Sequence, residues 1–433
     1  MLKMLPCVFA VKNTYQIMVR VESESLMWVK VGDNCYYDDS NGILRSYKNI
    51  HRMIVPAEEL DKNGKYTIYE REIKERKPYF TETEEVKEYS FDFVPANREN
   101  LRAYHIADAH NLVDAPVRAE KAFGDIDFLI MNGDIPNHSG DIENFDNIYK
   151  IAEEITEGKK HVVFSRGNHD MRGIYAERIE DYTPTDNGKS YFTFRLGNLW
   201  GMVLDCGEDK QDDNEEYGNT VCCHAFRQRQ TQFIKDVIKN ADSEYLQEGI
   251  KNRLIIVHNP FTEQLKPPFD IEADIYTEWG KLIRENIKPD AMLCGHYHEQ
   301  YVSYPGDEHD SLGHPSPVIV GSKIDFEKKY FCGCGASESI GIIRRAPQIT
   351  SLCCDIIGDI AGIISGSATA VIAAELVVTF HWNGILPSLM LTGVVSSMTI
   401  GGKAFFKGIA MKNANSIVFS IGKFLNIFKL RRK

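Results

Sequence analysis

The sequence predicts an α/β protein with a β-rich segment before it and an apolar helical tail after it. Three observations favour this organisation. Residues 6 to about 95 alternate apolar and polar side chains in the manner of strands, with turn residues between them. From Leu101 on, short apolar runs alternate with helical stretches, which is typical of a layered α/β sheet. After Ser339 the chain becomes apolar and then basic.

The composition is that of a globular chain with an excess of acidic residues. The 433 residues carry a formal net charge of −12, and 43% of them are hydrophobic. This charge argues against a nucleic-acid backbone as the main partner. The ten cysteines include no CxxC pair, so we expect reduced core thiols rather than a disulfide framework. The apolar run in Met1 to Val11 is broken by Pro6, so we expect no export signal.

Residues 1–97 are predicted to form a β-sandwich. Val8–Val11, Tyr15–Val21 and Met27–Val31 have the composition of strands, and turn residues separate them. Tyr66 follows such a turn and fits a tyrosine corner, in which the hydroxyl pins the loop before a strand. It fits a plain strand-edge tyrosine equally well. We see no catalytic constellation in this part of the chain.

The segment after residue 100 is predicted to be an α/β domain. Its expected strands are Arg102–Ala107, Phe128–Met131, His161–Phe164, Trp200–Leu204, Leu254–Val257 and Ala291–Leu293. Its expected helices cover residues 114–123, 141–157, 227–240 and 275–287. Functional sites in such folds gather at the carboxyl ends of the strands.

Polar motifs follow five of these strands. They are Asp108-Ala109-His110, Gly133-Asp134, Gly167-Asn168-His169-Asp170, His258-Asn259 and Gly295-His296-Tyr297-His298. Each alone has a plain structural explanation: Asp134 as a helix cap, Asn168 as a loop residue, His258 as a core histidine. Five in succession, each at a strand end, instead predict one shared site. His296 and His298 stand two apart, so both can face one point in space.

These side chains suit a metal centre. Carboxylates and imidazoles without a thiolate favour Mn, Fe, Zn or Co. The candidate ligands are Asp108, His110, Asp134, Asn168, His258, His296 and His298. Seven ligands are too many for one ion and fit two that share a bridge, for which the two oxygens of Asp134 are suited. Two ions roughly 3.5–4 Å apart can hold a phosphate and generate hydroxide near neutral pH.

The leaving alkoxide would need a proton. His169, next to Asn168, is placed to act as general acid. We expect Asp170 to orient that imidazole and hold it charged, or to cap a helix, and the two roles are compatible. The segment Val203–Asp209 follows a strand and is expected to line the rim of the cleft.

Together these motifs resemble the calcineurin-like metallophosphoesterase superfamily. The resemblance covers about residues 100 to 330, and we place the domain at 98–335. It implies a four-layer α/β sandwich of two sheets flanked by helices. It assigns one metal to Asp108, His110, Asp134 and His298. It assigns the other to Asp134, Asn168, His258 and His296, with His169 as proton donor and Asp170 beside it.

A leading β-sandwich is similar to the arrangement in purple acid phosphatases, whose first domain is fibronectin type III-like. The purple enzymes have a tyrosine ligand in the second motif, where this chain has Ile135-Pro136-Asn137 after Asp134. Their first motif lacks the histidine found here as His110. We therefore expect Mn, Fe(II) or Zn rather than a purple Fe(III) centre.

Residues 340–433 form a hydrophobic tail with two candidate transmembrane helices, at 356–380 and 384–402. Both are long enough to span a bilayer. Basic residues flank the pair and none lies in the short connection, so both ends are expected in the cytoplasm. We therefore expect a membrane-associated protein with a cytoplasmic catalytic domain. A buried helical hairpin in a soluble protein is the alternative.

The predicted function is a two-metal phosphoesterase that hydrolyses a phosphomonoester or phosphodiester of a small molecule. Within the enzyme class, the alternative is a nucleotidase or a cyclic-nucleotide phosphodiesterase. From another class, the alternative is a non-catalytic, membrane-anchored binding or transport-related protein. The complete ligand set argues against this last alternative, because a degenerate copy would be free to lose ligands.

Overall fold

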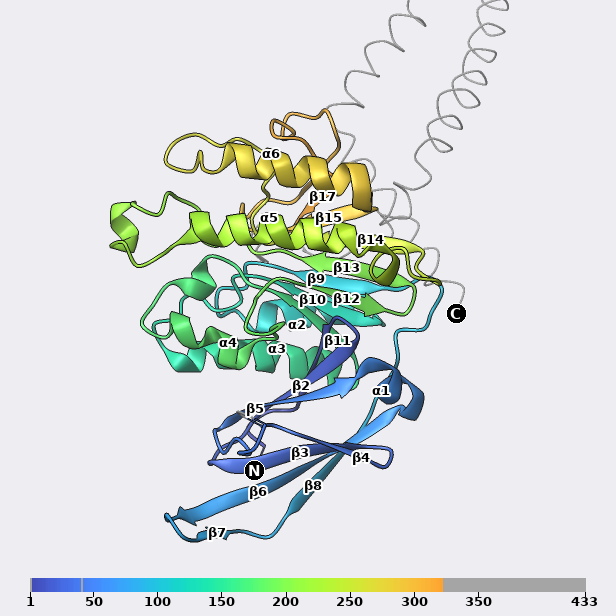
Figure 1. Cartoon of the computed structure of the whole chain (residues 1–433), viewed down its shortest axis with the longest axis vertical. Coiled ribbons are helices and arrows are strands. Elements are labelled where there is room, and N and C mark those ends of the chain that lie inside the picture. The colour runs from blue at the N-terminus through green and yellow to red at the C-terminus, as the bar shows by residue number, and fades with distance from the viewer. Residues whose placement is uncertain (1, 40–41, 322–433) are drawn as a thin grey trace, which may run out of the picture. The chain divides into compact units, whose positions relative to one another are not determined.

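The computed structural model describes residues 2–39 and 42–321 (Figure 1). Two six-stranded sheets form the centre of this part. The first contains, in spatial order, β5 (Ile50–Pro56), β2 (Thr14–Arg20), β1 (Cys7–Val11), β11 (His161–Ser165), β10 (Phe128–Asn132) and β9 (Ala103–Ile106). The second contains β12 (Phe192–Leu196), β13 (Leu199–Val203), β14 (Asn252–Ile256), β15 (Ala291–Cys294), β17 (Val318–Val320) and β16 (Tyr301–Ser303).

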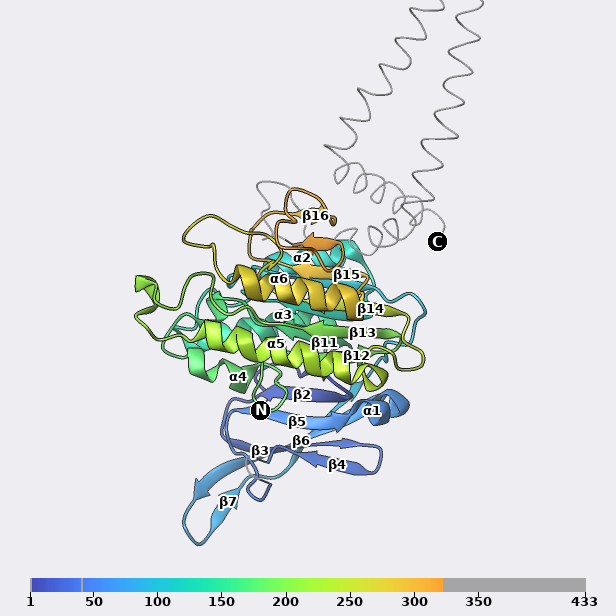
Figure 2. The same cartoon turned by 45° about the horizontal axis from the view of Figure 1, so that its top comes forward.

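Helices cover the outer face of each sheet (Figures 1 and 2). The first sheet packs against α2 (Asp114–Phe123) and α3 (Asp146–Thr156), and the second against α5 (Cys223–Lys239) and α6 (Ala273–Leu282). In α3, Ile148, Ile151, Ala152 and Ile155 are buried, which is the spacing of one apolar helix face. The predicted four-layer α/β sandwich is therefore confirmed for this part of the chain.

All six strands predicted after residue 100 are present, and the central ones are buried on both faces. Every residue of β10 and β11 is buried, which explains why these strands appear in the sequence as continuous apolar runs. The strands β9, β10 and β11 are parallel, as are β13, β14 and β15. Their carboxyl ends therefore meet at one edge of each sheet.

The strands of the first 97 residues are divided between two sheets. β1 pairs in parallel with β11, and β2 and β5 extend the same sheet, so three of these strands belong to the α/β sandwich. All five residues of β1 are buried, as expected for a strand covered on both faces. The segment is β-rich as predicted, but this pairing is not that of an independent fibronectin type III-like sandwich.

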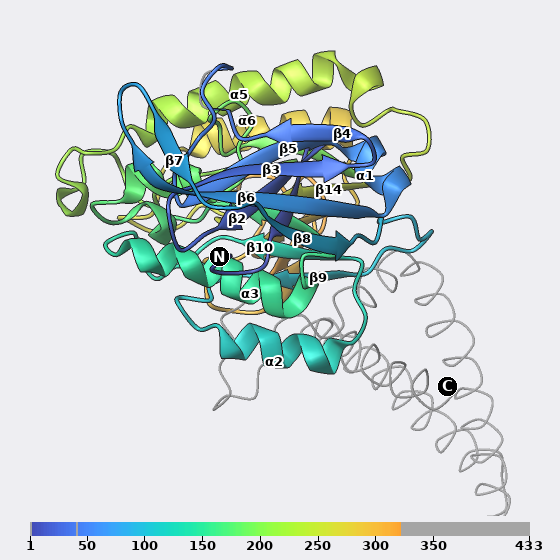
Figure 3. The ribbon, with the colours of Figure 1, turned by 90° about the horizontal axis from the view of Figure 1, so that it is seen from below.

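The remaining N-terminal strands form a separate five-stranded sheet, seen from below in Figure 3. Its strands are β3 (Ser25–Val31), β4 (Asn34–Tyr37), β6 (Lys65–Arg76), β7 (Thr81–Thr83) and β8 (Lys87–Asp92), and α1 (Ala57–Asn63) precedes β6. The Tyr66 hydroxyl donates a hydrogen bond to the carbonyl of Gly158, 2.7 Å away in the turn after α3. Tyr66 therefore ties this sheet to the α/β layer, and it does not form the local tyrosine corner.

The predicted tail at residues 340–433, with its candidate spans at 356–380 and 384–402, lies outside the described residues. Within the residues that are described, no helix is long and apolar enough to cross a membrane.

Candidate metal centre

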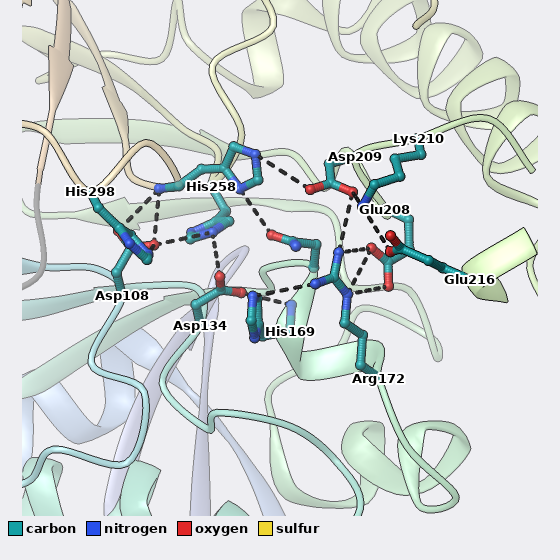
Figure 4. A network of polar contacts seen from close by, with 12 residues as sticks. Asp108, Asp134, His169, Arg172, Glu208, Asp209, Lys210, Glu216, His258 and His298 are labelled. Atoms are coloured by element: carbon teal, nitrogen blue, oxygen red, sulfur yellow. Dashed lines mark hydrogen bonds and ion pairs between the residues drawn. The ribbon is translucent and has the colours of Figure 1, made fainter. Parts of the chain in front are cut away.

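The five polar motifs meet at the carboxyl edge of the two sheets (Figure 4). Three motifs follow strands of the first sheet and two follow strands of the second. The strands concerned are β9, β10 and β11 in the first sheet and β14 and β15 in the second. All seven candidate ligands are thereby brought to one place, from positions as far apart in sequence as Asp108 and His298.

One group of ligand atoms comes from Asp108, His110 and His298, all within 4.8 Å of one another. The Nε2 atom of His298 lies 3.3 Å from Oδ1 of Asp108 and 3.0 Å from Nε2 of His110. Two imidazole nitrogens and a carboxylate oxygen that converge in this way present lone pairs to one point, as metal ligands must.

A second group comes from Asp134, His258 and His296, again within 4.8 Å. The Nε2 atom of His258 lies 3.1 Å from Oδ2 of Asp134 and 3.7 Å from Oδ1 of Asp108. The Nδ1 atom of His296 lies 3.0 Å from the amide oxygen of Asn168, which brings that side chain into the group.

Asp134 joins the two groups. Together with His110 and His169 it forms a third set of atoms within 4.8 Å. The carboxylate is almost fully buried, with an exposed fraction of 1%, and its two oxygens have different neighbours. One faces His258, and the other accepts a hydrogen bond from the backbone N–H of His169 at 2.9 Å. This position is the one that a bridging carboxylate requires.

The surroundings of the His258 side chain show whether a cation fits between the two groups of ligands. Its Nδ1–H donates to the carbonyl of Asn132 at 2.6 Å, because a carbonyl can only accept. Its Nε2 atom is buried without a hydrogen-bond partner and faces the carboxylates of Asp108 and Asp134. An unprotonated Nε2 that faces two buried carboxylates is repelled by them unless a proton or a metal ion lies between. The donor set therefore fits a divalent metal ion.

The pKa values of the histidines agree with this fit. Burial lowers the pKa of His258, but the carboxylates of Asp134 and Asp108 outweigh burial and raise it to about 10. A proton therefore occupies in the metal-free protein the place that a metal ion would take. Burial lowers the pKa of His110 and of His296 to about 4, so both are neutral near pH 7 and have a lone pair available.

The backbone of the ligand loops is strained. Asp108, His110, Asp134, His296 and His298 all have positive φ, between 44° and 75°. Residues with a Cβ atom avoid this left-handed region at a cost of roughly 1–2 kcal/mol each. Strain of this kind is found where the surrounding structure enforces it, most often at functional sites. Five strained residues in one cluster therefore indicate a functional site.

Glycines in the same motifs allow the loops to approach closely. A Cβ atom at Gly167 would lie 2.2 Å from Oδ1 of Asp134, and one at Gly133 would lie 2.5 Å from Nδ1 of His258. At Gly295 a Cβ atom would lie 2.6 Å from that of Ala107. Any side chain at these positions would displace a ligand or its loop.

His169 lies in the cluster, but Asp170 does not orient its ring as predicted. The Nδ1–H of His169 donates to the carbonyl of Asn137 at 2.8 Å. The Oδ2 atom of Asp170 accepts hydrogen bonds from the backbone N–H groups of Gly167, at 2.7 Å, and Asp134, at 3.2 Å. Asp170 therefore holds two ligand loops together, and a backbone carbonyl fixes the imidazole.

The sequence analysis did not single out Arg172, which follows His169 closely in the chain. Its Nη1–H donates to Nε2 of His169 at 3.4 Å, and its guanidinium is held by Glu208 and Asp209 (Figure 4). The segment that was expected to line the cleft rim thus contributes the two carboxylates of this network. The only sequence signal for Arg172 is its place three residues after the candidate acid.

The fold and the site together define a metal-dependent α/β enzyme. Residues 101–300 match the family of calcineurin-like phosphoesterases. This part of the chain is a calcineurin-like metallophosphoesterase domain, with candidate His and Asp metal ligands.

The solved structures that are similar to this chain include a phosphatase and a nucleotidase. One is the purple acid phosphatase PPD1 from yellow lupin (Lupinus luteus) seeds, with 13% sequence identity and a TM-score of 0.46. The similar region covers 73% of this chain and 63% of the lupin chain. The other is a 5'-nucleotidase from Candida albicans, with 14% identity, a TM-score of 0.31, and coverage of 53% of this chain and 47% of that one. No curated protein matches this sequence.

Proposed function

We propose that this protein hydrolyses a phosphomonoester or phosphodiester of a small molecule with two divalent metal ions. The main support is that three groups of histidine and aspartate atoms overlap: the third set shares His110 with the first group and Asp134 with the second. The absence of a thiolate from this ligand set favours Mn, Fe(II) or Zn. The acidic net charge of −12 favours a small phosphorylated substrate over a nucleic acid.

Each ion has a proposed set of ligands. One ion is assigned to Asp108, His110, Asp134 and His298. The other is assigned to Asp134, Asn168, His258 and His296. When bound, such ions supply Lewis acidity toward a phosphate ester and lower the pKa of water.

The residues of the chain orient these ligands and the substrate. Asn132 fixes the tautomer of His258 through its carbonyl, so that Nε2 faces the cluster. The carbonyl of Asn137 fixes His169 in the same way. The ring of His169 lies 4.6 Å from that of His110, centroid to centroid. We therefore assign His169 the transfer of a proton from Nε2 to the leaving oxygen.

The test is hydrolysis of nitrophenyl phosphate and bis-nitrophenyl phosphate with added manganese. Asp134→Asn keeps the size of the side chain but removes the charge shared between the two groups. We expect it to lower kcat/KM by at least about 100-fold and to reduce the bound metal. Asp270→Asn makes the same chemical change at an exposed position and should change neither quantity. Activity that survives both Asp134→Asn and chelation would refute the proposal.

We further propose that the tail attaches the enzyme to a membrane, with the catalytic domain on the cytoplasmic side. This rests on the two apolar segments at 356–380 and 384–402 and on the basic residues around them. The full chain should sediment with membranes after an alkaline wash. Protease added to sealed vesicles should cut the catalytic domain only when the cytoplasmic face is outside. Recovery of the chain in the washed supernatant would contradict membrane attachment.

A further inference from the structure

We propose that Arg172 binds an anionic leaving group, and that the preferred substrate is therefore one whose leaving group is itself a phosphate, as in a phosphoanhydride. This inference rests on the proposed function and narrows its substrate class.

The guanidinium lies against Nε2 of His169, the ring nitrogen that is left to face a substrate. The Nδ1–H of His169 donates to the carbonyl of Asn137, and the Nη1–H of Arg172 donates to Nε2 of the same ring at 3.4 Å. A carbonyl only accepts and a guanidinium only donates, so Nε2 accepts in this arrangement. His169 can give a proton to a leaving oxygen only once Nε2 has gained that proton and the contact with Nη1 has opened. A substrate oxygen that approaches Nε2 therefore also approaches Nη1 of Arg172.

Two carboxylates hold Arg172 in this orientation. The Nε–H and Nη2–H groups donate to Glu208 at 3.0 and 2.8 Å, and Nη2–H also donates to Asp209 at 3.2 Å. The third nitrogen, Nη1, is thereby directed at His169. Burial disfavours the charged guanidinium, but the two carboxylates outweigh burial and raise the pKa of Arg172 above its ordinary value. Arg172 is therefore a fixed cation beside His169.

The carboxylates of this network have further partners, so they are not left to repel a substrate. Asp209 accepts hydrogen bonds from Lys210 at 3.2 Å and from the Tyr217 hydroxyl at 2.9 Å. Arg172 and Lys210 thus offset the charges of Glu208 and Asp209, and Lys210 also pairs with the exposed Glu216 at 2.9 Å. Figure 4 shows the two basic side chains and the carboxylates on one side of the cluster. An anion at Nη1 therefore meets a cation whose two carboxylate partners are both paired with basic side chains.

The network is anchored to the core of the domain. Arg227 on α5 is buried and donates to the carbonyl of Cys206 at 2.7 Å and to that of Glu208. On the other side, Oδ2 of Asp209 lies 3.9 Å from Nε2 of the candidate ligand His296. The same loop thus reaches both Arg172 and the metal ligands. A position fixed in this way costs little reorganisation when the substrate binds.

The chemistry of the leaving group determines which class of substrate Arg172 would favour. Hydrolysis breaks the bond between phosphorus and the leaving oxygen, and the electron pair stays on that oxygen. Water supplies the hydroxyl for the retained phosphoryl group, and its proton goes to solvent or to the leaving phosphate. An alkoxide needs a proton to leave, whereas a phosphate leaves as a stable anion. With Nε and Nη2 held by Glu208 and Asp209, Nη1 is the group left to donate a charge-assisted hydrogen bond, which favours an anionic phosphate leaving group.

Binding to the metal-loaded full chain tests this proposal without relying on turnover. Calorimetry would compare imidodiphosphate, a non-hydrolysable phosphoanhydride analogue, with inorganic phosphate. The wild type should bind imidodiphosphate at least about tenfold more tightly than inorganic phosphate. Arg172→Gln should weaken the binding of imidodiphosphate by about 10- to 100-fold. The affinity for inorganic phosphate and the bound metal should change much less. Arg178→Gln, at an arginine that is about half exposed in a neighbouring turn, should match the wild type.

Further variants separate charge recognition from a merely structural role. Arg172→Gln leaves Glu208 buried without its partner, so the double variant with Glu208→Gln keeps the measurement possible if the single variant does not fold. Arg172→Lys should retain only part of the preference, because an ammonium cannot keep the two-point contact with Glu208 that directs Nη1 at His169. Equal affinity of the wild type for the two anions, or an equal loss for both in the variants, would overturn the proposal.

Turnover assays distinguish this inference from the proposed function. Pyrophosphate hydrolysis should fall more than nitrophenyl phosphate hydrolysis in Arg172→Gln. A metal-loaded wild type that hydrolyses no phosphate compound would refute the proposed function. In that case the difference in affinity between imidodiphosphate and inorganic phosphate would still decide whether Arg172 binds a phosphate leaving group.

Discussion

Replacing Gly167 by alanine tests how the ligand loops depend on close backbone approach. The new Cβ atom would lie 2.2 Å from Oδ1 and 2.6 Å from the backbone nitrogen of Asp134, where real Cβ contacts are not found below 3.0 Å. The carboxylate would have to move by about 0.8 Å, and overpacking of this kind costs roughly 1–3 kcal/mol of folding stability. Since Asp134 lies between the two ligand groups, we expect metal affinity to fall by about 10- to 100-fold. Urea unfolding and metal titration of the purified variant measure these two effects.

Gly188→Ala provides the matched control. Gly188 has a φ of +75° and nothing within 4 Å of the added methyl group, so the substitution introduces backbone strain without a clash. It should cost about 1 kcal/mol and leave the metal affinity unchanged. The reasoning would be refuted if Gly167→Ala bound metal as tightly as Gly188→Ala.

Two further predictions concern the metal-free protein and the N-terminal sheet. Because the carboxylates of Asp134 and Asp108 outweigh burial and raise the pKa of His258 to about 10, metal binding at pH 7 must displace its proton. Calorimetry in buffers of different ionisation enthalpy should therefore detect the release of at least one proton when the metal binds. The affinity for the metal should increase with pH up to about 10. Metal binding without proton release would contradict this prediction. Tyr66→Phe removes a buried hydrogen bond to Gly158 and should cost about 1 kcal/mol of stability in urea without changing metal affinity. A change in metal affinity would contradict the purely structural role assigned to this hydrogen bond.

The central strands and the ligand cluster could be predicted because they depend on local patterns. Parallel strands covered on both faces appear as continuous apolar runs, and β10 and β11 are of this kind. Their carboxyl ends must meet at one edge of the sheet. Side chains that follow different strands, such as Asp134 and His258, therefore come together without any sequence proximity.

The features that were missed depend on contacts between distant segments. Cys7–Val11 has the composition of any short strand, and only its pairing with β11 places it in the α/β sandwich. The ring of His169 is fixed by the backbone carbonyl of Asn137. Every residue has a backbone carbonyl, so the sequence does not indicate which one makes this contact. The partners of Arg172 are Glu208 and Asp209, which reach it only after the second sheet has formed.

Anomalous diffraction from crystals loaded with manganese is the most direct test of a two-metal centre organised by Asp134. We predict two peaks roughly 3.5–4 Å apart, one on each side of that carboxylate. A single peak, or peaks away from the seven side chains at the carboxyl edge of the sheets, would contradict this prediction.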